Sequence, residues 1–303
     1  MPFQALTADD TVAALSQIGV DVSADEIQIE RREERWLVLL PDERIGWFAA
    51  TNVGRDVLAN DRRVLRLVEE RCTFESPRIL AEHPSTEFDV RAMVKGASDP
   101  FQLYAAACSD SNVAEQMGAR IGEMLAELHT TILRADIEHV VQHKPSWPED
   151  KAWILERLPQ VVDDGELIEK ANEALTRYER VQVDDADRVL IHGDLGLHAI
   201  AYNPNTFQVN GLFDFEGAAY ADRHHDFRYL MFGGVSTLLD SALDVYQNIT
   251  RRTLDRSRIY LYNAACALSY LAFRVGHSPD ERWCGRTLRD DLQWTGDALE
   301  SIR

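Results

Sequence analysis

The chain has 303 residues, and its 51 acidic and 32 basic side chains give a formal net charge of −19. Hydrophobic residues make up 45% of it, enough to bury a sizeable core, so the composition excludes an intrinsically disordered protein. The acidic balance argues against nucleic-acid partners and against an anionic membrane surface, since both attract Lys and Arg. It suits a cationic ligand, although an acidic surface also serves solubility alone.

The first hundred residues predict a small mixed sheet with one main helix. A short amphipathic helix capped by Thr7 is expected over Asp9–Ile18, and a long helix over Val53–Glu70. Strands are expected at Glu26–Arg31, Trp36–Leu40, Ile45–Ala49, Arg78–Ala81 and Phe88–Val94.

The character of the sequence changes at Lys95-Gly96, where we place the boundary between a first unit, residues 1–96, and a second, residues 97–303. The second unit is predicted to be mainly helical as far as Arg303. Helices are expected over Val113–Ile132 and, as a pair, between Asp150 and Arg180, and a hairpin is expected from Val189–Tyr202 and Gly211–Phe215. The pattern predicts an α+β fold with two unequal lobes.

The four cysteines are scattered without a CxxC pair, which indicates neither a zinc site nor a redox pair. Free thiols of this kind are typical of a reducing compartment, so we expect a cytoplasmic protein. The N-terminal residues lack the basic and apolar regions of a signal peptide. The longest apolar run, Ile259–Phe273, is too short to span a bilayer and predicts a buried helix.

Two carboxylates stand where buried strands are expected to end. Asp194 follows the apolar run Val189–Ile191, and Asp214 follows Leu212-Phe213. A hairpin between these segments would bring both carboxylates into one cleft. Carboxylates in such positions need a cation, a proton or hydrogen bonds. The pair therefore suits a base that accepts a hydroxyl proton and a ligand for magnesium.

Here the sequence resembles the aminoglycoside phosphotransferase family, small-molecule kinases with a protein-kinase-like fold. His192-Gly193-Asp194 matches the opening of the family's H-G-D-x-x-x-x-N loop, and Leu212–Glu216 matches its metal-binding strand. Asp222 and Asp226 match two acidic positions that follow, and Leu128-His129 matches a helix that ends in L-H. The resemblance is close over residues 190–230 and loose elsewhere.

The resemblance implies an ATP- or GTP-dependent enzyme that transfers a γ-phosphoryl group to a hydroxyl with Mg²⁺ as cofactor. Asp194 and His192 would be the catalytic residues, Asp194 as base and His192 as a support of the loop. Asp214 would bind the metal, while Asp226 and Glu216 would be structural supports. Lys95 would lie at the hinge between the lobes, beside the nucleotide, and Trp47 would hold the place of the phosphate-binding Lys on the third strand.

Three departures from the family pattern stand out. Ala199 occupies the position of the metal-binding Asn, and His198, a residue type that some macrolide kinases carry there, falls one residue early. Trp47 replaces the Lys, as in viomycin-kinase-like members, so its helix partner Asp61 is expected to form a surface salt bridge with a neighbouring Arg. The first strand turn, Glu30–Arg35, has no glycine to cradle phosphates.

Three other classes compete. A kinase-like pseudoenzyme that binds nucleotide or a ligand without transfer is suggested by Ala199 and Trp47. A metal hydrolase would use histidines and carboxylates in the same stretch, yet their spacing matches no hydrolase motif, and His224-His225 are expected at the surface or at a helix start. A structural or interaction protein without a pocket is the least compatible with the clustered motifs.

The acceptor is less constrained by the sequence. Acidic clusters in the helical half would attract a cationic acceptor such as an aminoglycoside, although each cluster alone is typical of a solvated helix face. They lie at Glu149-Asp150, Asp163–Glu166, Asp290-Asp291 and Asp297–Glu300. Four tryptophans, Trp147, Trp153, Trp283 and Trp294, are candidates for a ring-binding wall or for the core. Small alcohols remain open as acceptors.

Overall fold

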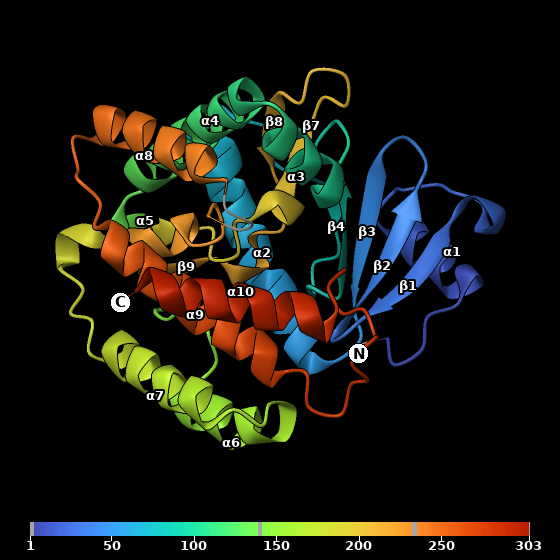
Figure 1. Ribbon diagram of the computed structural model, residues 1–303. Coiled ribbons are helices and arrows are strands. Elements are labelled where there is room, and N and C mark those ends of the chain that lie inside the picture. Colours follow the sequence, from blue (N-terminus) through green and yellow to red (C-terminus); the bar gives the residue numbers. More distant parts are fainter. Residues whose placement is uncertain (1–2, 139–140, 232–234, 303) are drawn as a thin grey trace.

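The computed structural model describes residues 3–138, 141–231 and 235–302. Both outer ends of the predicted units, residue 1 and Arg303, lie outside these ranges. A five-stranded antiparallel sheet forms one lobe, and helices form the larger lobe beside it (Figure 1). The α+β class and the two unequal lobes are therefore as predicted.

The small lobe is built on a sheet with the strand order β1-β2-β3-β5-β4. Its elements are α1 (Ala8–Gln17), β1 (Gln28–Arg32), β2 (Arg35–Leu40), β3 (Arg44–Ala49), α2 (Asn52–Arg71), β4 (Arg78–Glu82) and β5 (Phe88–Ala92), with a 3₁₀ turn at Ala24–Glu26. Thr7 and Asp10 form the capping box that starts α1. Phe48 and Phe88 stack at 5.0 Å in the core of this lobe. All five predicted strands are present.

The chain crosses between the lobes just after β5. The backbone amides and carbonyls of Ala97 and Tyr202 pair in both directions, at 2.8 and 2.9 Å. Gly96 has φ +125°, and a Cβ there would lie 2.4 Å from the Tyr202 carbonyl oxygen, so only glycine fits this close approach. This crossing lies at the predicted boundary, which stays a prediction as a division into domains.

The large lobe consists mainly of helices. They are α3 (Pro100–Ser109), α4 (Ser111–Thr131), α5 (Arg134–Ile137), α6 (Lys151–Val161), α7 (Gly165–Glu179), α8 (Ser236–Thr250), α9 (Arg256–Ala272) and α10 (Leu288–Ser301). The predicted pair between Asp150 and Arg180 is α6 and α7, and the predicted buried helix is α9, whereas α3 was not predicted. None of the helices in the described ranges is both long and apolar enough to cross a membrane.

Four short strands lie between α7 and α8 and carry the predicted motifs. They are β6 (Arg188–Ile191), β7 (Ile200–Tyr202), β8 (Val209–Leu212) and β9 (Ala219–Asp222), interspersed with 3₁₀ turns at Asp185–Asp187, Leu197–Ala199, Phe215–Gly217 and Arg223–Phe227. The predicted hairpin is only partly right. β7 pairs with β8, but β6 pairs with β9, because the loop at 192–199 breaks the first run. Two loops therefore emerge side by side, one after β6 and one after β8.

Candidate active site

The loop after β6 is held by the buried carboxylate of Asp226. Its oxygens accept hydrogen bonds from the backbone amides of His192, at 2.8 Å, and Gly193, at 2.9 Å. His129, on α4, donates a third from Nε2 at 3.0 Å. Burial alone would raise the pKa of Asp226, but these donors hold it below its ordinary value. A charged side chain thus fixes the backbone of the loop.

The loop after β8 is joined to the first one by His192 and Gly193. The ring of His192 is fully buried and donates from Nε2 to the Phe213 carbonyl at 2.9 Å. Gly193 has φ +85°, and a Cβ there would lie 1.9 Å from the Gly217 carbonyl oxygen. His192 is therefore a support that links the two loops, and its ring does not face the cleft.

The two carboxylate oxygens of Asp194 have different surroundings, because in the described part of the chain one accepts a hydrogen bond and the other does not. Oδ2 accepts a hydrogen bond from His198 Nε2 at 3.3 Å. Oδ1 is buried and accepts no hydrogen bond from the described residues, and Arg228 Nη2 lies 3.8 Å away. Burial raises the pKa of Asp194, but His198 and Arg228 outweigh it, so the pKa is lowered. The carboxylate is thus ionised at neutral pH.

Arg228 is a functional residue that the sequence analysis missed. Its side chain is fully buried, and its guanidinium donates to the carbonyls of Gly193, at 2.6 Å, and His225, at 2.7 Å. It thereby sets the position of the loop and places positive charge beside Asp194. In the sequence, only the position of Arg228 two residues after Asp226 could have pointed to it.

Asp214 stands at the kink that ends β8. Its φ of 68° is left-handed, a conformation uncommon outside glycine and frequent at functional sites. The side chain is exposed, while the surrounding protein limits its solvation and, with the neighbouring Asp194 carboxylate, raises its pKa. Two carboxylates that disfavour each other's charge form a suitable place for a cation.

Ala199 and His198, at the position of the family's metal-binding Asn, differ in their access to the cleft. The Ala199 side chain is fully buried in the core and has no access to the cleft. The ring of His198 is partly exposed and contacts Asp194, and the negative charge of Asp214 contributes to its raised pKa. Gly196 leaves room for it, since a Cβ there would lie 2.7 Å from the imidazole. The local register therefore places His198, and not residue 199, beside the two carboxylates.

On the small-lobe side, Arg35 and Asp61 take the place that a Lys and its helix partner would hold. Arg35 Nη1 lies 3.1 Å from Asp61 Oδ2, and its guanidinium lies 4.3 Å over the Trp47 ring. The prediction that Asp61 forms a surface salt bridge is wrong, because Asp61 is only 3% exposed. The partner is indeed an Arg, but it comes from β2 and not from a neighbour in the sequence.

The same network continues along the sheet. Arg91 Nη1 lies 3.2 Å from Asp61 Oδ2, and Arg91 Nε lies 2.8 Å from Asp89. Arg62 Nε also contacts Asp89, at 2.9 Å. Buried charges are costly unless paired in this way. The residues come from α2, β2 and β5, and no local sequence motif predicts the network.

The other predicted support and hinge residues are placed as follows. The Glu216 carboxylate contacts the guanidinium of Arg35, and burial raises its pKa to about 7. Lys95 is exposed, and its backbone carbonyl accepts a hydrogen bond from Asn210 at 2.7 Å. Trp47 is half-buried beneath Arg35.

Asp222, His224 and His225 lie apart from the two loops. The sequence predicts the two histidines at the surface or at a helix start. They lie in the 3₁₀ turn at Arg223–Phe227, so the second alternative holds, whereas a surface position is wrong because they are 2% and 4% exposed. Among the described residues, Asp187, Asp222 and His224 could approach one ion together, but Arg258 Nη1 already lies 3.2 Å from both acids. The histidines are therefore not gathered into one metal centre of the hydrolase type.

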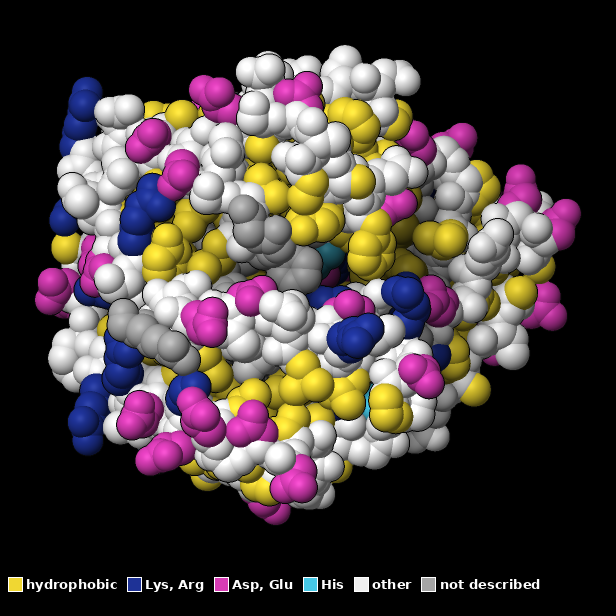
Figure 2. Space-filling view, viewed as in Figure 1, with side chains coloured by type: hydrophobic (Ala, Val, Ile, Leu, Met, Phe, Trp, Pro, Cys, Tyr) yellow, Lys and Arg dark blue, Asp and Glu magenta, His cyan; other side chains and the backbone are white. Residues whose placement is uncertain are grey.

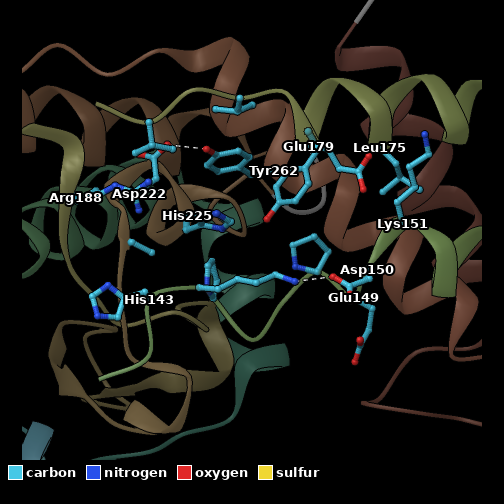
Figure 3. Close-up of a pocket in the computed structure, with 17 residues that line it drawn as sticks. His143, Glu149, Asp150, Lys151, Leu175, Glu179, Arg188, Asp222, His225 and Tyr262 are labelled. Atoms are coloured by element: carbon cyan, nitrogen blue, oxygen red, sulfur yellow. Dashed lines mark hydrogen bonds and ion pairs between the residues drawn. The ribbon is translucent and has the colours of Figure 1, made fainter. Parts of the chain in front are cut away.

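Figure 3 shows a cavity of about 370 Å³ beside this group. It is lined by His143–Lys151, by α7, and by Asp222, His225 and Tyr262, and neither Asp194 nor Asp214 lines it. The cavity is thus separate from the candidate active site. A different hollow opens near the centre of the face in Figure 2, between the helices and the sheet, with a histidine at its floor and charged side chains at its rim.

Aromatic side chains from α9, α10 and the segments around them gather near Asp194. Tyr270 stacks on Trp147 at 5.0 Å and contacts Trp283 and Trp294. The cluster reaches the site through Tyr229, whose ring lies 6.2 Å from the ring of Trp294 and 6.2 Å from the ring of His198. The predicted tryptophans thus belong to one aromatic cluster with Tyr270, and this cluster lies partly in the core.

The acidic clusters predicted to attract a cationic acceptor carry less exposed charge than the sequence suggests. Asp291 is fully buried, and its oxygens lie 2.6 Å from both Arg274 Nε and Arg286 Nε. Its charge is therefore neutralised inside the protein. The clusters at 163–166 and 149–150 keep exposed carboxylates.

The two-lobed fold and the paired Asp194 and Asp214 loops define the protein-kinase-like class. The model of the phosphotransferase enzyme family matches residues 15–260, more than half of the chain, and the chain belongs to that family.

Three relatives illustrate the similarity. Streptomycin 3''-kinase of Streptomyces griseus is 35% identical over 81 residues, which are 27% of this chain and 29% of that enzyme. The GDP and kanamycin complex of APH(2")-IIia has a TM-score of 0.67 at 18% identity and covers 98% of this chain and 97% of its own. Macrolide 2'-phosphotransferase MphH from Brachybacterium faecium has a TM-score of 0.63 at 14% identity, with 98% and 97% covered.

Proposed function

We propose that this protein transfers the γ-phosphoryl group of ATP or GTP to a hydroxyl group of a small molecule, and that the acceptor is an aminoglycoside such as streptomycin. The observation that carries the proposal is the pair of loops that present Asp194 and Asp214 together, fixed by Asp226 and His192. A reaction that uses ATP or GTP as donor suits a protein of the cytoplasm.

Asp194 orients the acceptor hydroxyl and accepts its proton. His198 bonds its Oδ2, and Arg228 lies 3.8 Å from its Oδ1, so both groups hold the carboxylate in place. The hydroxyl oxygen forms a bond to the γ-phosphorus as the bond to the bridging oxygen of the nucleotide breaks. The low pKa of Asp194 favours positioning of the hydroxyl, with the proton transferred as the bond forms.

Asp214 fits a magnesium ion. Its exposed carboxylate supplies the oxygen donors that Mg²⁺ prefers, and limited solvation, together with the negative charge of Asp194, raises its pKa. When bound, the ion would neutralise charge on the nucleotide phosphates. His198 offers a nitrogen next to this group, where the family resemblance implies an Asn.

The choice of acceptor rests on the streptomycin kinase relative and on exposed acidic clusters of the helical lobe. The aromatic cluster around Tyr270 supplies flat surfaces on which a sugar ring can lie. A macrolide is the second candidate, because the same cluster suits a large apolar ring.

The test is a coupled assay of phosphate transfer with MgATP and MgGTP against streptomycin, kanamycin, gentamicin and one macrolide. We expect transfer to at least one aminoglycoside, and Asp194→Asn should reduce kcat by about 10³-fold or more while nucleotide affinity is kept. Unchanged turnover in Asp194→Asn would contradict the assigned base. Nucleotide binding without transfer to any of these acceptors would favour the pseudoenzyme.

A further inference from the structure

We propose that Arg35 binds the phosphates of the nucleotide, so that a guanidinium from β2 supplies the cation that β3 lacks at Trp47. The inference rests on the proposed function, because it requires a nucleotide in the cleft. It assigns a role to the last residue of the Glu30–Arg35 turn, which has no glycine to cradle phosphates.

The position of Arg35 on the sheet supports this role. Arg35 pairs with Ala49 in the β2–β3 ladder, and Trp47, two residues before Ala49, therefore lies on the same face of the sheet. The guanidinium reaches across that face and stacks 4.3 Å above the indole of Trp47. The positive charge thus occupies the space above the position from which a β3 Lys would project.

The reach of Arg35 extends to the metal-binding loop. Its Nη1 bonds Asp61 of α2 at 3.1 Å, and its Nη2 contacts the carboxylate of Glu216. Glu216 lies two residues after Asp214, the proposed magnesium ligand. The guanidinium therefore spans the gap between α2 and the loop beside which the nucleotide phosphates are expected.

The charges around Arg35 leave it able to take an anion. The carboxylate of Asp61 serves two guanidinium groups, since Arg91 also contacts it at 3.2 Å. The remaining partner, Glu216, is 43% exposed and can turn toward solvent. A phosphate oxygen could replace that carboxylate without leaving a buried charge unpaired, and the planar fork of Arg suits phosphate.

Arg91 provides a matched control. It is buried to the same degree as Arg35, with side chains 6% and 7% exposed, and it shares the Asp61 partner. Its hydrogen bonds go to Asp89 and Asp61 rather than to the loop of Asp214. In either variant, Arg35→Met or Arg91→Met, the other arginine continues to pair with Asp61.

The experiment measures dissociation constants by calorimetry for MgATP, MgGTP and the corresponding nucleosides, in the full chain. We expect Arg35→Met to weaken binding of the preferred nucleotide by about 10- to 100-fold and to leave nucleoside binding unchanged. Arg91→Met should change neither by more than about threefold. Arg35→Lys, which keeps the charge, should recover part of the affinity and replaces Arg35→Met if thermal unfolding shows that the latter does not fold.

Several outcomes would overturn the role of Arg35. Nucleotide affinity unchanged in Arg35→Met, or lowered equally for nucleotide and nucleoside, would show that Arg35 only ties α2 to the loop. Equal losses in Arg35→Met and Arg91→Met would show a general effect of the network. Failure of the wild-type chain to bind any MgATP or MgGTP would instead contradict the proposed function, which keeps the two failures distinguishable.

Discussion

The two lobes approach the candidate site with different chemistry. In the large lobe, side chains bind backbone groups: Asp226 accepts from two loop amides, and His192 donates to a carbonyl of the next loop. In the small lobe, side chains bind one another, as Arg35 and Arg91 share Asp61. Backbone contacts fix the path of a loop, whereas a side-chain network can exchange one partner for another. The motif is recognisable in the large lobe, whereas the small lobe lacks the β3 Lys, and we propose that Arg35 supplies the cation there.

The strongest test of this contrast is Asp226→Ala. The change leaves two buried amides and His129 without their acceptor, so we expect the free energy of unfolding to fall by about 3–5 kcal/mol. Phosphate transfer should be lost because the loop is released, while the folded fraction keeps its nucleotide affinity. Chemical denaturation and calorimetry measure the two effects.

The control for that change is Asp240→Ala, which removes an exposed ion pair with Arg256 and should cost at most about 1 kcal/mol. If Asp226→Ala instead kept its transfer activity, the loop would not depend on its backbone ties. If it weakened nucleotide binding as strongly as Arg35→Met, the division of labour between the lobes would be wrong.

The contrast also explains what the sequence could predict. Asp194, Asp214 and Asp226 lie within 33 positions of one another, each at a loop or turn beside a short strand or 3₁₀ turn, so the resemblance to the family could single them out from one stretch of sequence. Arg35, Asp61 and Arg91 come from three elements, and their meeting depends on strand order and register. A hydrophobic pattern predicts that strands exist, but it does not predict which charged side chains on them will meet.

Two neighbouring histidines show the same limit on a smaller scale. His224 and His225 look like solvated residues in the sequence, yet both are buried, His224 Nδ1 against Asp222 at 2.6 Å and His225 stacked on Tyr262 at 4.0 Å. Asp222 is two residues away in the sequence, whereas Tyr262 is supplied by the tertiary packing of α9. His198 as a substitute for the Asn stays a prediction, and its access to the cleft depends on the 3₁₀ turn that buries Ala199.

The second test concerns the one place where the large lobe departs from its motif. His198→Ala removes the hydrogen bond that holds Asp194 Oδ2, and we expect kcat to fall by about 10- to 100-fold. His198→Asn keeps a donor at the same place and should recover part of the rate. Steady-state kinetics with the acceptor found in the assay panel measure both.

Ala199→Asn is the matched comparison. It places a polar side chain in a buried, packed position and should destabilise the protein by about 1–3 kcal/mol without raising kcat. An increase in kcat for Ala199→Asn would mean that the loop can shift its register by one residue. His198 would then have no role of its own.

At neutral pH the smallest effect is expected from His225→Phe, at a histidine of the same segment that lies outside the site. Burial, with the nearby charge of Arg228, lowers the pKa of His225 to about 3, whereas an unfolded histidine titrates near 6.5. Between these values the unfolded state binds the extra proton, so stability is complete above about pH 6.5 and falls as the pH drops, by up to about 1.4 kcal/mol per pH unit from this group. Phe keeps a ring against Tyr262 and cannot take the proton, so denaturation curves from pH 7 to 4 should show a shallower decline for the variant. Equal slopes in both proteins would mean that the unfolding reaction does not charge His225, and that the cavity beside it admits enough water to solvate the imidazolium.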